Sequence, residues 1–173
     1  DAVDPSAGIH VNNGQGLAAE TAVVEDNYVR DITGDAYSIV GVGVRADRNY
    51  TQDCGRTGFS VTGSGHHLAG NTVRTVGWDG YDVAATGVLL TDCFVTDAGR
   101  DGFRVTGAGA TLAQCFAGDA AADGIHCAAA NVTFTECTLR GNRLDVAADA
   151  GLPLIDGGGN VFDTGGPSAA PVD

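Results

Sequence analysis

Three residues with chemically active side chains stand 22 positions apart in the chain: Asp82, Arg104 and His126. If 22 residues make one turn of a repeating fold, these side chains lie next to one another on one face. Such a row could act on a uronate sugar. Arg104 would neutralise the sugar carboxylate, His126 would take the C5 proton, and Asp82 would orient Arg104. The alternative is structural, because outward strand positions are polar anyway and an Asp–Arg pair between strands is a common surface contact.

A second group with the same spacing lies four residues before the first and consists of Arg56, Trp78 and Arg100. Trp78 is the only tryptophan of the chain. On an exposed turn its ring could stack on a sugar while the two arginines bind acidic groups of the substrate. The alternative is that Trp78 covers a neighbouring turn. Trp78 and Arg100 are expected to converge with the first group on one side of the molecule, which is the strongest functional signal in the sequence.

A column of carboxylates follows directly after the tryptophan column and contains Asp35, Asp79, Asp101 and Asp123, with Thr57 in the gap. Stacked carboxylates repel one another unless something bridges them. Ca²⁺ is one candidate, at Asp79, Asp101 and Asp123, because it binds several carboxylate oxygens. The other candidate is the backbone N–H groups of a turn, because Asp commonly caps a turn that Gly closes. No spacing of His and Cys residues supports a zinc site.

The elements that must position these side chains are predicted from a ladder with the same period. Each 22-residue unit is one turn of a coil, and the ladder side chains stack inside it. Its asparagines can satisfy one another and the turn backbone, whereas its cysteines are interpreted as small buried apolar residues. Five cysteines are an odd number, so at least one has no partner in its own chain. The ladder comprises Asn27, Asn49, Asn71, Cys93, Cys115, Cys137 and, one residue later than the period requires, Asn160.

Alternating apolar residues in each unit predict three short strands around a narrow, filled core. His66 falls in an inward column with Val44, Val88 and Val132, so it is interpreted as a core histidine. The clearest inward column, whose members all follow a glycine except Tyr37, consists of Tyr37, Phe59, Tyr81, Phe103 and Ile125. Further inward columns are formed by residues 39, 61, 83, 105 and 127, by residues 46, 68, 90, 112 and 134, and by residues 29, 51, 73, 95, 117 and 139.

The repeat also indicates the domain organisation. About seven coils are expected over residues 8–163, after a short lead-in segment at 1–7 and before a flexible tail or linker at 164–173. A loop is expected at 12–20, where a unit gains about six residues. The last unit, 143–165, is irregular because Pro153 and three successive glycines interrupt it.

The repeats resemble the right-handed parallel β-helix of the pectate-lyase-like superfamily. The resemblance rests on the Asp-Gly-[Phe/Tyr/Ile]-x-[Val/Cys] strand and on the asparagine ladder about 12 residues later, and it covers roughly residues 8–163. It implies an all-β solenoid and a working groove outside the first strand of each coil. The outward column of that strand would contain His10, Ser38, Ser60, Asp82, Arg104, His126 and Asp145. The fold alone does not imply one activity, because lyases, hydrolases, epimerases, viral spikes and adhesins share it.

Charge and composition exclude some partners. The net charge is −13 with 19 Asp and no Lys, so general binding to nucleic acid is not expected. Abundant Asp without Lys resembles proteins of halophilic organisms, and a GC-rich bacterial source is the alternative. No apolar run is long enough to span a membrane, and no signal peptide precedes Asp1, so a processed product or an excised domain is expected.

Two functions follow as hypotheses. The first is a secreted or cell-surface domain that binds or processes a polysaccharide, and that, if it is an enzyme, acts as a lyase, an epimerase or a glycoside hydrolase. A hydrolase would need two carboxylates about 5–9.5 Å apart, a distance that no spacing fixes. The second hypothesis is a non-catalytic spike, adhesin or filament domain that self-assembles, because a coil of this kind exposes strand edges at both ends.

Overall fold

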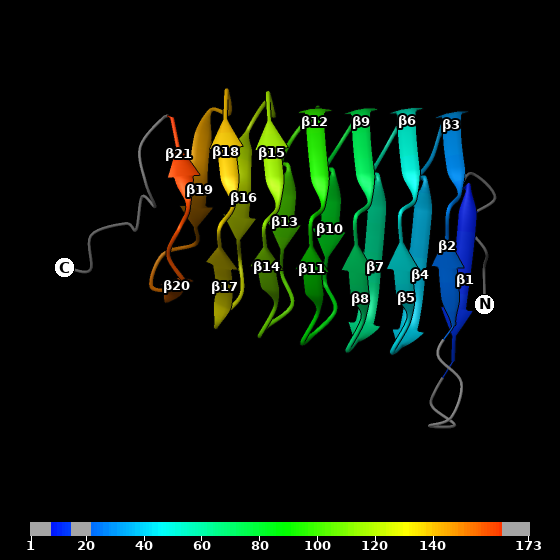
Figure 1. The fold of residues 1–173 in the computed structure, drawn as a ribbon, viewed down its shortest axis with the longest axis horizontal. Coiled ribbons are helices and arrows are strands. Elements are labelled where there is room, and N and C mark those ends of the chain that lie inside the picture. Colours follow the sequence, from blue (N-terminus) through cyan, green and yellow to red (C-terminus); the bar gives the residue numbers. More distant parts are fainter. Residues whose placement is uncertain (1–7, 15–21, 164–173) are drawn as a thin grey trace.

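The computed structural model describes residues 8–14 and 22–163. Within these residues the chain forms strands and no helix, and its successive turns stack side by side along one axis (Figure 1). No described segment is therefore a helix long and apolar enough to cross a membrane. The predicted lead-in segment 1–7, most of the predicted loop 12–20 and the tail 164–173 lie outside the described residues.

Three parallel seven-stranded sheets run the length of the coil, and each turn contributes one strand to each sheet. Sheet A contains β1 (Ile9–Asn13), β4 (Tyr37–Val42), β7 (Phe59–Ser64), β10 (Tyr81–Val83), β13 (Phe103–Val105), β16 (Asp123–Cys127) and β19 (Leu144–Ala148). Sheet B contains β2 (Val23–Glu25), β5 (Arg45–Asp47), β8 (His67–Ala69), β11 (Leu89–Thr91), β14 (Thr111–Ala113), β17 (Val132–Thr135) and β20 (Leu154–Asp156). Sheet C contains β3 (Tyr28–Ile32), β6 (Tyr50–Cys54), β9 (Thr72–Val76), β12 (Phe94–Ala98), β15 (Phe116–Gly118), β18 (Thr138–Arg140) and β21 (Val161–Phe162). The predicted all-β parallel solenoid with three short strands per coil is confirmed.

The strands pair in the predicted 22-residue register from Tyr37 through Ile125, where each residue lies beside the one 22 positions later. The period breaks in the last coil. Leu144 lies beside Asp123, a step of 21, and Val161 lies beside Thr138, a step of 23. The step is 22 again on sheet B, where Leu154 lies beside Val132, so the coil gains two residues between sheets A and C. The displaced rung at Asn160 follows from this gain.

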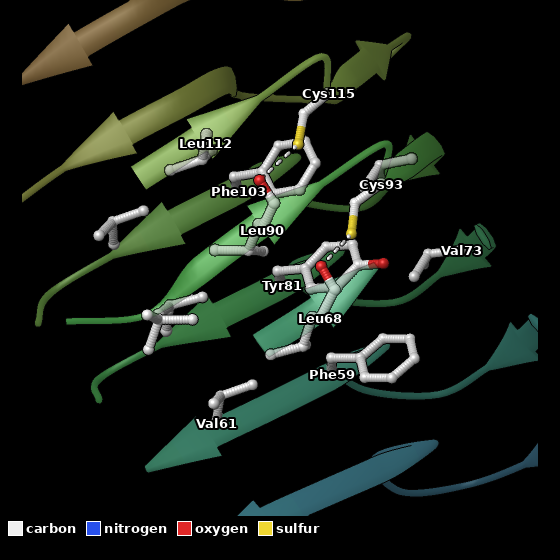
Figure 2. Packing of buried hydrophobic residues seen from close by; sticks show 14 of the residues in the cluster. Phe59, Val61, Leu68, Val73, Tyr81, Leu90, Cys93, Phe103, Leu112 and Cys115 are labelled. Atoms are coloured by element: carbon white, nitrogen blue, oxygen red, sulfur yellow. Dashed lines mark hydrogen bonds between the residues drawn. The ribbon is translucent and has the colours of Figure 1, made fainter. Parts of the chain in front are cut away.

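The predicted inward columns form one continuous buried core. Tyr37, Phe59, Tyr81 and Phe103 stack face to face, with ring centroids 4.4 to 4.9 Å apart. Figure 2 shows three of these rings beside the leucine and cysteine columns. Because every coil places a similar side chain at the same height, each layer of the core packs on a nearly identical layer.

The ladder changes from amide to thiol side chains, and the prediction of apolar cysteines is right only in part. Cys93, Cys115 and Cys137 lie in the apolar core, but each thiol also donates a hydrogen bond to the backbone carbonyl 25 residues earlier. Oδ1 of Asn71 accepts hydrogen bonds from both the backbone N–H and the Nδ2 of Asn49, at 2.9 and 3.0 Å. Asn49 accepts the same pair from Asn27. The five cysteines are buried free thiols, and burial raises the pKa of Cys127 to about 12.

The glycines before Phe59, Tyr81 and Phe103 of sheet A are explained by a close approach between coils. A Cβ added to Gly80 would lie 2.5 Å from the carbonyl oxygen of Gly102 and 2.5 Å from Val95 Cγ1. Gly58 and Gly102 meet the next glycine carbonyl in the same way. These positions exclude a side chain because the turns there stack backbone on backbone.

His66 is a satisfied core histidine, as predicted. It is 1% exposed, its Nδ1 accepts the backbone N–H of Val44 at 3.0 Å, and its Nε2 lies 3.1 Å from the carbonyl oxygen of Thr62. This pattern requires a neutral ring with the proton on Nε2. Burial lowers the pKa of His66 below its ordinary value.

Stability is therefore expected to fall as the pH drops below about 6.5, the pKa of an unperturbed histidine. Below that pH the unfolded chain binds a proton that the folded state resists, so protons favour unfolding. Urea unfolding at pH 7.5 and pH 5.5 measures the loss. In His66→Val, which repeats the residue of the neighbouring coils, the loss between these two pH values should be smaller. An equal loss in both proteins would assign it to other groups.

Candidate functional site

Parallel pairing brings Asp82, Arg104 and His126 together on the outer face of sheet A. Asp82 and Arg104 occupy the middle positions of β10 and β13, His126 is the fourth residue of β16, and the three are in register from strand to strand. Arg104 Nη1 donates a hydrogen bond to Asp82 Oδ1 at 3.3 Å, and both side chains are about one-third exposed. The expected contact between these two residues is therefore present, and Arg104 is already paired with a carboxylate.

His126 is held by carboxylates on both sides of its ring. Its Nδ1 lies 3.0 Å from Asp123 Oδ2, and its Nε2 lies 3.4 Å from Asp149 Oδ1. Asp123 is buried and accepts a further hydrogen bond at 2.8 Å from Arg143. Because Asp149 is exposed, Nε2 becomes available to a ligand when the Asp149 side chain turns away, whereas the buried Asp123 fixes the ring orientation.

The outward position predicted for Asp145 is wrong. Asp145 is 1% exposed, and it accepts hydrogen bonds from Asn142 and from the backbone N–H of Asp163. The 21-residue step of the last coil places Ala147 beside His126 instead. Arg143 and Asp149 were also not identified as site residues from the sequence. Both lie in the irregular last unit, where the 22-residue period does not indicate which residues share a column.

Arg56, Trp78 and Arg100 also come together, on the turns that lead from sheet C into sheet A. The guanidinium carbons of Arg56 and Arg100 lie 4.7 and 6.0 Å from the centroid of the Trp78 ring. These arginines come from the coils on either side, so they approach opposite faces of the ring. Trp78 remains 43% exposed, but a sugar could stack on its face only by displacing a guanidinium.

The carboxylate column caps turns, which agrees with the second of the two sequence hypotheses. Asp79 Oδ1 accepts the backbone N–H of Asp101 at 3.1 Å, and Asp101 Oδ1 accepts that of Asp123 at 3.0 Å. Asp35 accepts the N–H of Thr57 in the same way. All but Asp35 of these carboxylates are buried, and burial raises the pKa of Asp79.

The donor atoms that come closest together differ from the predicted calcium set. Among the described residues, side-chain donors of Asp101, Asp123 and His126 lie within 4.8 Å of one another, and Asp79 is not part of this group. Two carboxylates and an imidazole suit a transition metal better than Ca²⁺, which prefers oxygen ligands alone. Calcium binding at Asp79, Asp101 and Asp123 stays a prediction, and their turn-capping bonds account for these carboxylates without it.

Every arginine of this face has an acidic partner. Arg56 lies 3.7 Å from Asp35, and Arg100 lies 3.7 Å from Asp79. Together with the pairs of Arg104 and Arg143, they make the face a network of alternating charges rather than a basic patch. Such a surface offers many hydrogen-bond donors and acceptors to a hydroxyl-rich ligand.

Comparison with known proteins agrees with this architecture. A family model described as "Right handed beta helix region" matches residues 7–165. No curated protein sequence matches the chain.

Proposed function

Since the chain belongs to the right-handed β-helix family, we propose that it is a secreted or cell-surface domain that binds a polysaccharide along the outer face of sheet A. One observation carries the proposal: Asp82, Arg104 and His126 stand in register on adjacent strands, and Asp123 and Arg143 fix the last of them. The core and the ladder account for the fold, so this network of side chains is available for a ligand.

The chemistry of the network suits a sugar chain. Asp82 and Arg104 can accept and donate hydrogen bonds to hydroxyl groups, and the exposed edge of Trp78 can contact an apolar sugar face. If the ligand carries a uronate, Arg104 can exchange Asp82 for the sugar carboxylate, and His126, oriented by Asp123, can act as a base through Nε2. The proposal itself is that the domain binds a polysaccharide, and catalytic processing of that polysaccharide is an extension of it.

A glycan array followed by titration of the best ligand tests binding. Arg104→Gln is expected to weaken that ligand about fivefold to tenfold, because a charged hydrogen-bond donor is lost. Arg30→Gln is the matched control, since Arg30 also forms an exposed ion pair, with Asp31, but lies on sheet C. Absence of any bound glycan, or an equal loss of affinity in both variants, would contradict the proposal.

Ultraviolet detection of unsaturated product from uronate polymers, compared with His126→Ala, tests the lyase extension.

A second candidate is a non-catalytic rod that self-assembles. It is favoured by the uninterrupted stacking of the seven-stranded sheets, which leaves strand edges only at the two ends. The C-terminal end of the coil is less suited to stacking on another copy, because Asp156 stands in the inward column that Phe134 occupies one coil earlier. Its carboxylate binds the Asn160 side chain and the Gly158 N–H. A rod that grows end to end would have to bury this charge.

Light scattering after size exclusion separates the two candidates. The rod hypothesis expects dimers or longer chains, and Asp156→Val is expected to lengthen them by restoring an apolar inward column. Monomers in both proteins, together with glycan binding, would leave only the first candidate.

A further inference from the structure

Two arginines of this acidic protein form no ion pair within the part of the chain that the structure describes. Seven of the nine arginines form ion pairs: Arg30, Arg45, Arg48, Arg56, Arg100, Arg104 and Arg143. Arg74 and Arg140 form none with any described residue, although the chain has 22 acidic residues. Both are exposed and lie in one outward column of sheet C, away from the site on sheet A. Unpaired cations are the natural contacts of an anionic ligand.

The surroundings of Arg74 differ from those of every neighbouring coil. An outward row of aromatic rings crosses sheet C, with Tyr28 stacked on Tyr50 and Phe94 stacked on Phe116. Thr72 of β9 interrupts this row, because it pairs with Tyr50 on one side and Phe94 on the other. Two strand spacings, about 9–10 Å, therefore separate these two positions, enough for one ring between them. The guanidinium of Arg74 lies over the Phe94 ring, 5.9 Å from its centroid.

Carboxylates are also missing from this coil. Segment 70–76 contains no Asp or Glu. Asp occupies the equivalent position near the end of the sheet C strand in the other coils, at residues 31, 53, 97 and 119, but the residue there in β9 is Thr75. All five have positive φ, and Thr75, at 48°, is the only β-branched one. A β-branched side chain is unfavourable in this conformation, so the absence of Asp has a cost in stability and points to a role.

We propose that the outer face of β9 binds a carboxylate-bearing ring, specifically a uronic acid residue of a glycan. Arg74 binds the carboxylate through paired N–H groups, and the ring lies above Thr72 between Tyr50 and Phe94. Three features that favour this ligand coincide in one coil. They are the cation without an ion pair at Arg74, the gap in the aromatic row at Thr72, and the absence of a carboxylate at Thr75.

Other partners fit this surface less well. A nucleic acid gains affinity from several phosphate contacts, and here one arginine stands on a protein of net charge −13. A folded protein partner needs about 800 Å² on each side, far more than the outer face of one five-residue strand provides. A single charged ring needs one cation and two flanking apolar surfaces. Arg74 of β9 is the cation, and the neighbouring strands supply Tyr50 and Phe94, whose ring is exposed to the ligand when Arg74 turns from it to the carboxylate. The proposal does not depend on the site of sheet A.

Titration calorimetry with galacturonate oligomers and with the uncharged galactose oligomers tests the proposal. Arg74→Gln is expected to weaken galacturonate binding about tenfold. Arg140→Gln is the matched control, because it removes the same charge from the same column, but Arg140 lies on β18, three coils away from the aromatic gap. Equal weakening by both variants, or equal binding of the uncharged oligomers, would overturn the proposal.

Thr75 separates a binding role from a structural one. Thr75→Asn and Thr75→Asp should both raise the melting temperature by about 2 °C, because Asn and Asp tolerate positive φ. Only Thr75→Asp should weaken galacturonate binding, about threefold, since it restores a carboxylate beside the ligand. If Thr75→Asp binds as tightly as Thr75→Asn, the missing carboxylate has no role in binding and the proposal fails.

Discussion

Replacing Asn71 by alanine is expected to lower the free energy of unfolding by about 4 kcal/mol, from the cost of leaving several buried polar groups unpaired. Oδ1 of Asn71 accepts two hydrogen bonds from Asn49, and its Nδ2 donates one to the carbonyl oxygen of Ala46 at 2.7 Å. Alanine leaves all three groups without partners in a fully buried layer. Urea unfolding monitored by circular dichroism measures the change.

Asn27→Ala provides the matched control for the ladder. Asn27 lies in the same column but is only partly buried, and water can replace the bonds that its side chain loses. Its loss of stability is expected to be about 1 kcal/mol. If both alanines have the same effect, burial does not set the strength of the ladder, and the asparagines matter mainly for register.

Removing one ring from the stack is the second change with a large expected effect. Tyr81→Ala should lower the free energy of unfolding by about 4 kcal/mol, because it leaves a cavity between two rings that cannot close. Tyr81 is fully buried and stacks on Phe59 and Phe103 with centroids 4.9 Å apart on both sides. Denaturant unfolding with intrinsic fluorescence measures the change, since Trp78 reports on an adjacent turn.

Tyr81→Phe separates the ring from its hydroxyl. The hydroxyl donates a hydrogen bond to the carbonyl oxygen of Asn71 at 3.2 Å, so its removal should cost only about 1 kcal/mol. A loss in Tyr81→Phe as large as in Tyr81→Ala would show that this hydrogen bond, and not the packing of the stack, determines the contribution of Tyr81.

The fold could be predicted from the sequence because one period governs it. The Asn and Cys ladder fixes the register, and the register then decides which residues point inward, as the buried columns from Tyr37 to Ile125 confirm. The prediction held wherever the period held. It failed at Asp145, because a coil that is one residue shorter moves every later side chain to the other face of the strand.

The candidate site was predictable only in part. The period placed Asp82, Arg104 and His126 in one row, but it gave no information on how each side chain turns. The partners of His126 in Asp123 and Asp149, and the arginines on both faces of Trp78, depend on rotamers and turn geometry. Arg74 escaped notice because what distinguishes it is the absence of partners, and sequence spacing does not reveal an absence.

The spacing of the ladder also bears on how the chain folds. Nearly every strand pairs with one about 22 residues away, so no pairing has to wait for a distant segment. Forming the first pair of coils means closing a loop of that length without a template, which is unfavourable. Each later coil then adds to an existing edge and closes a loop of the same size against an ordered surface. Folding is therefore expected to nucleate on two adjacent coils and to spread outward one coil at a time, like the growth of a one-dimensional crystal.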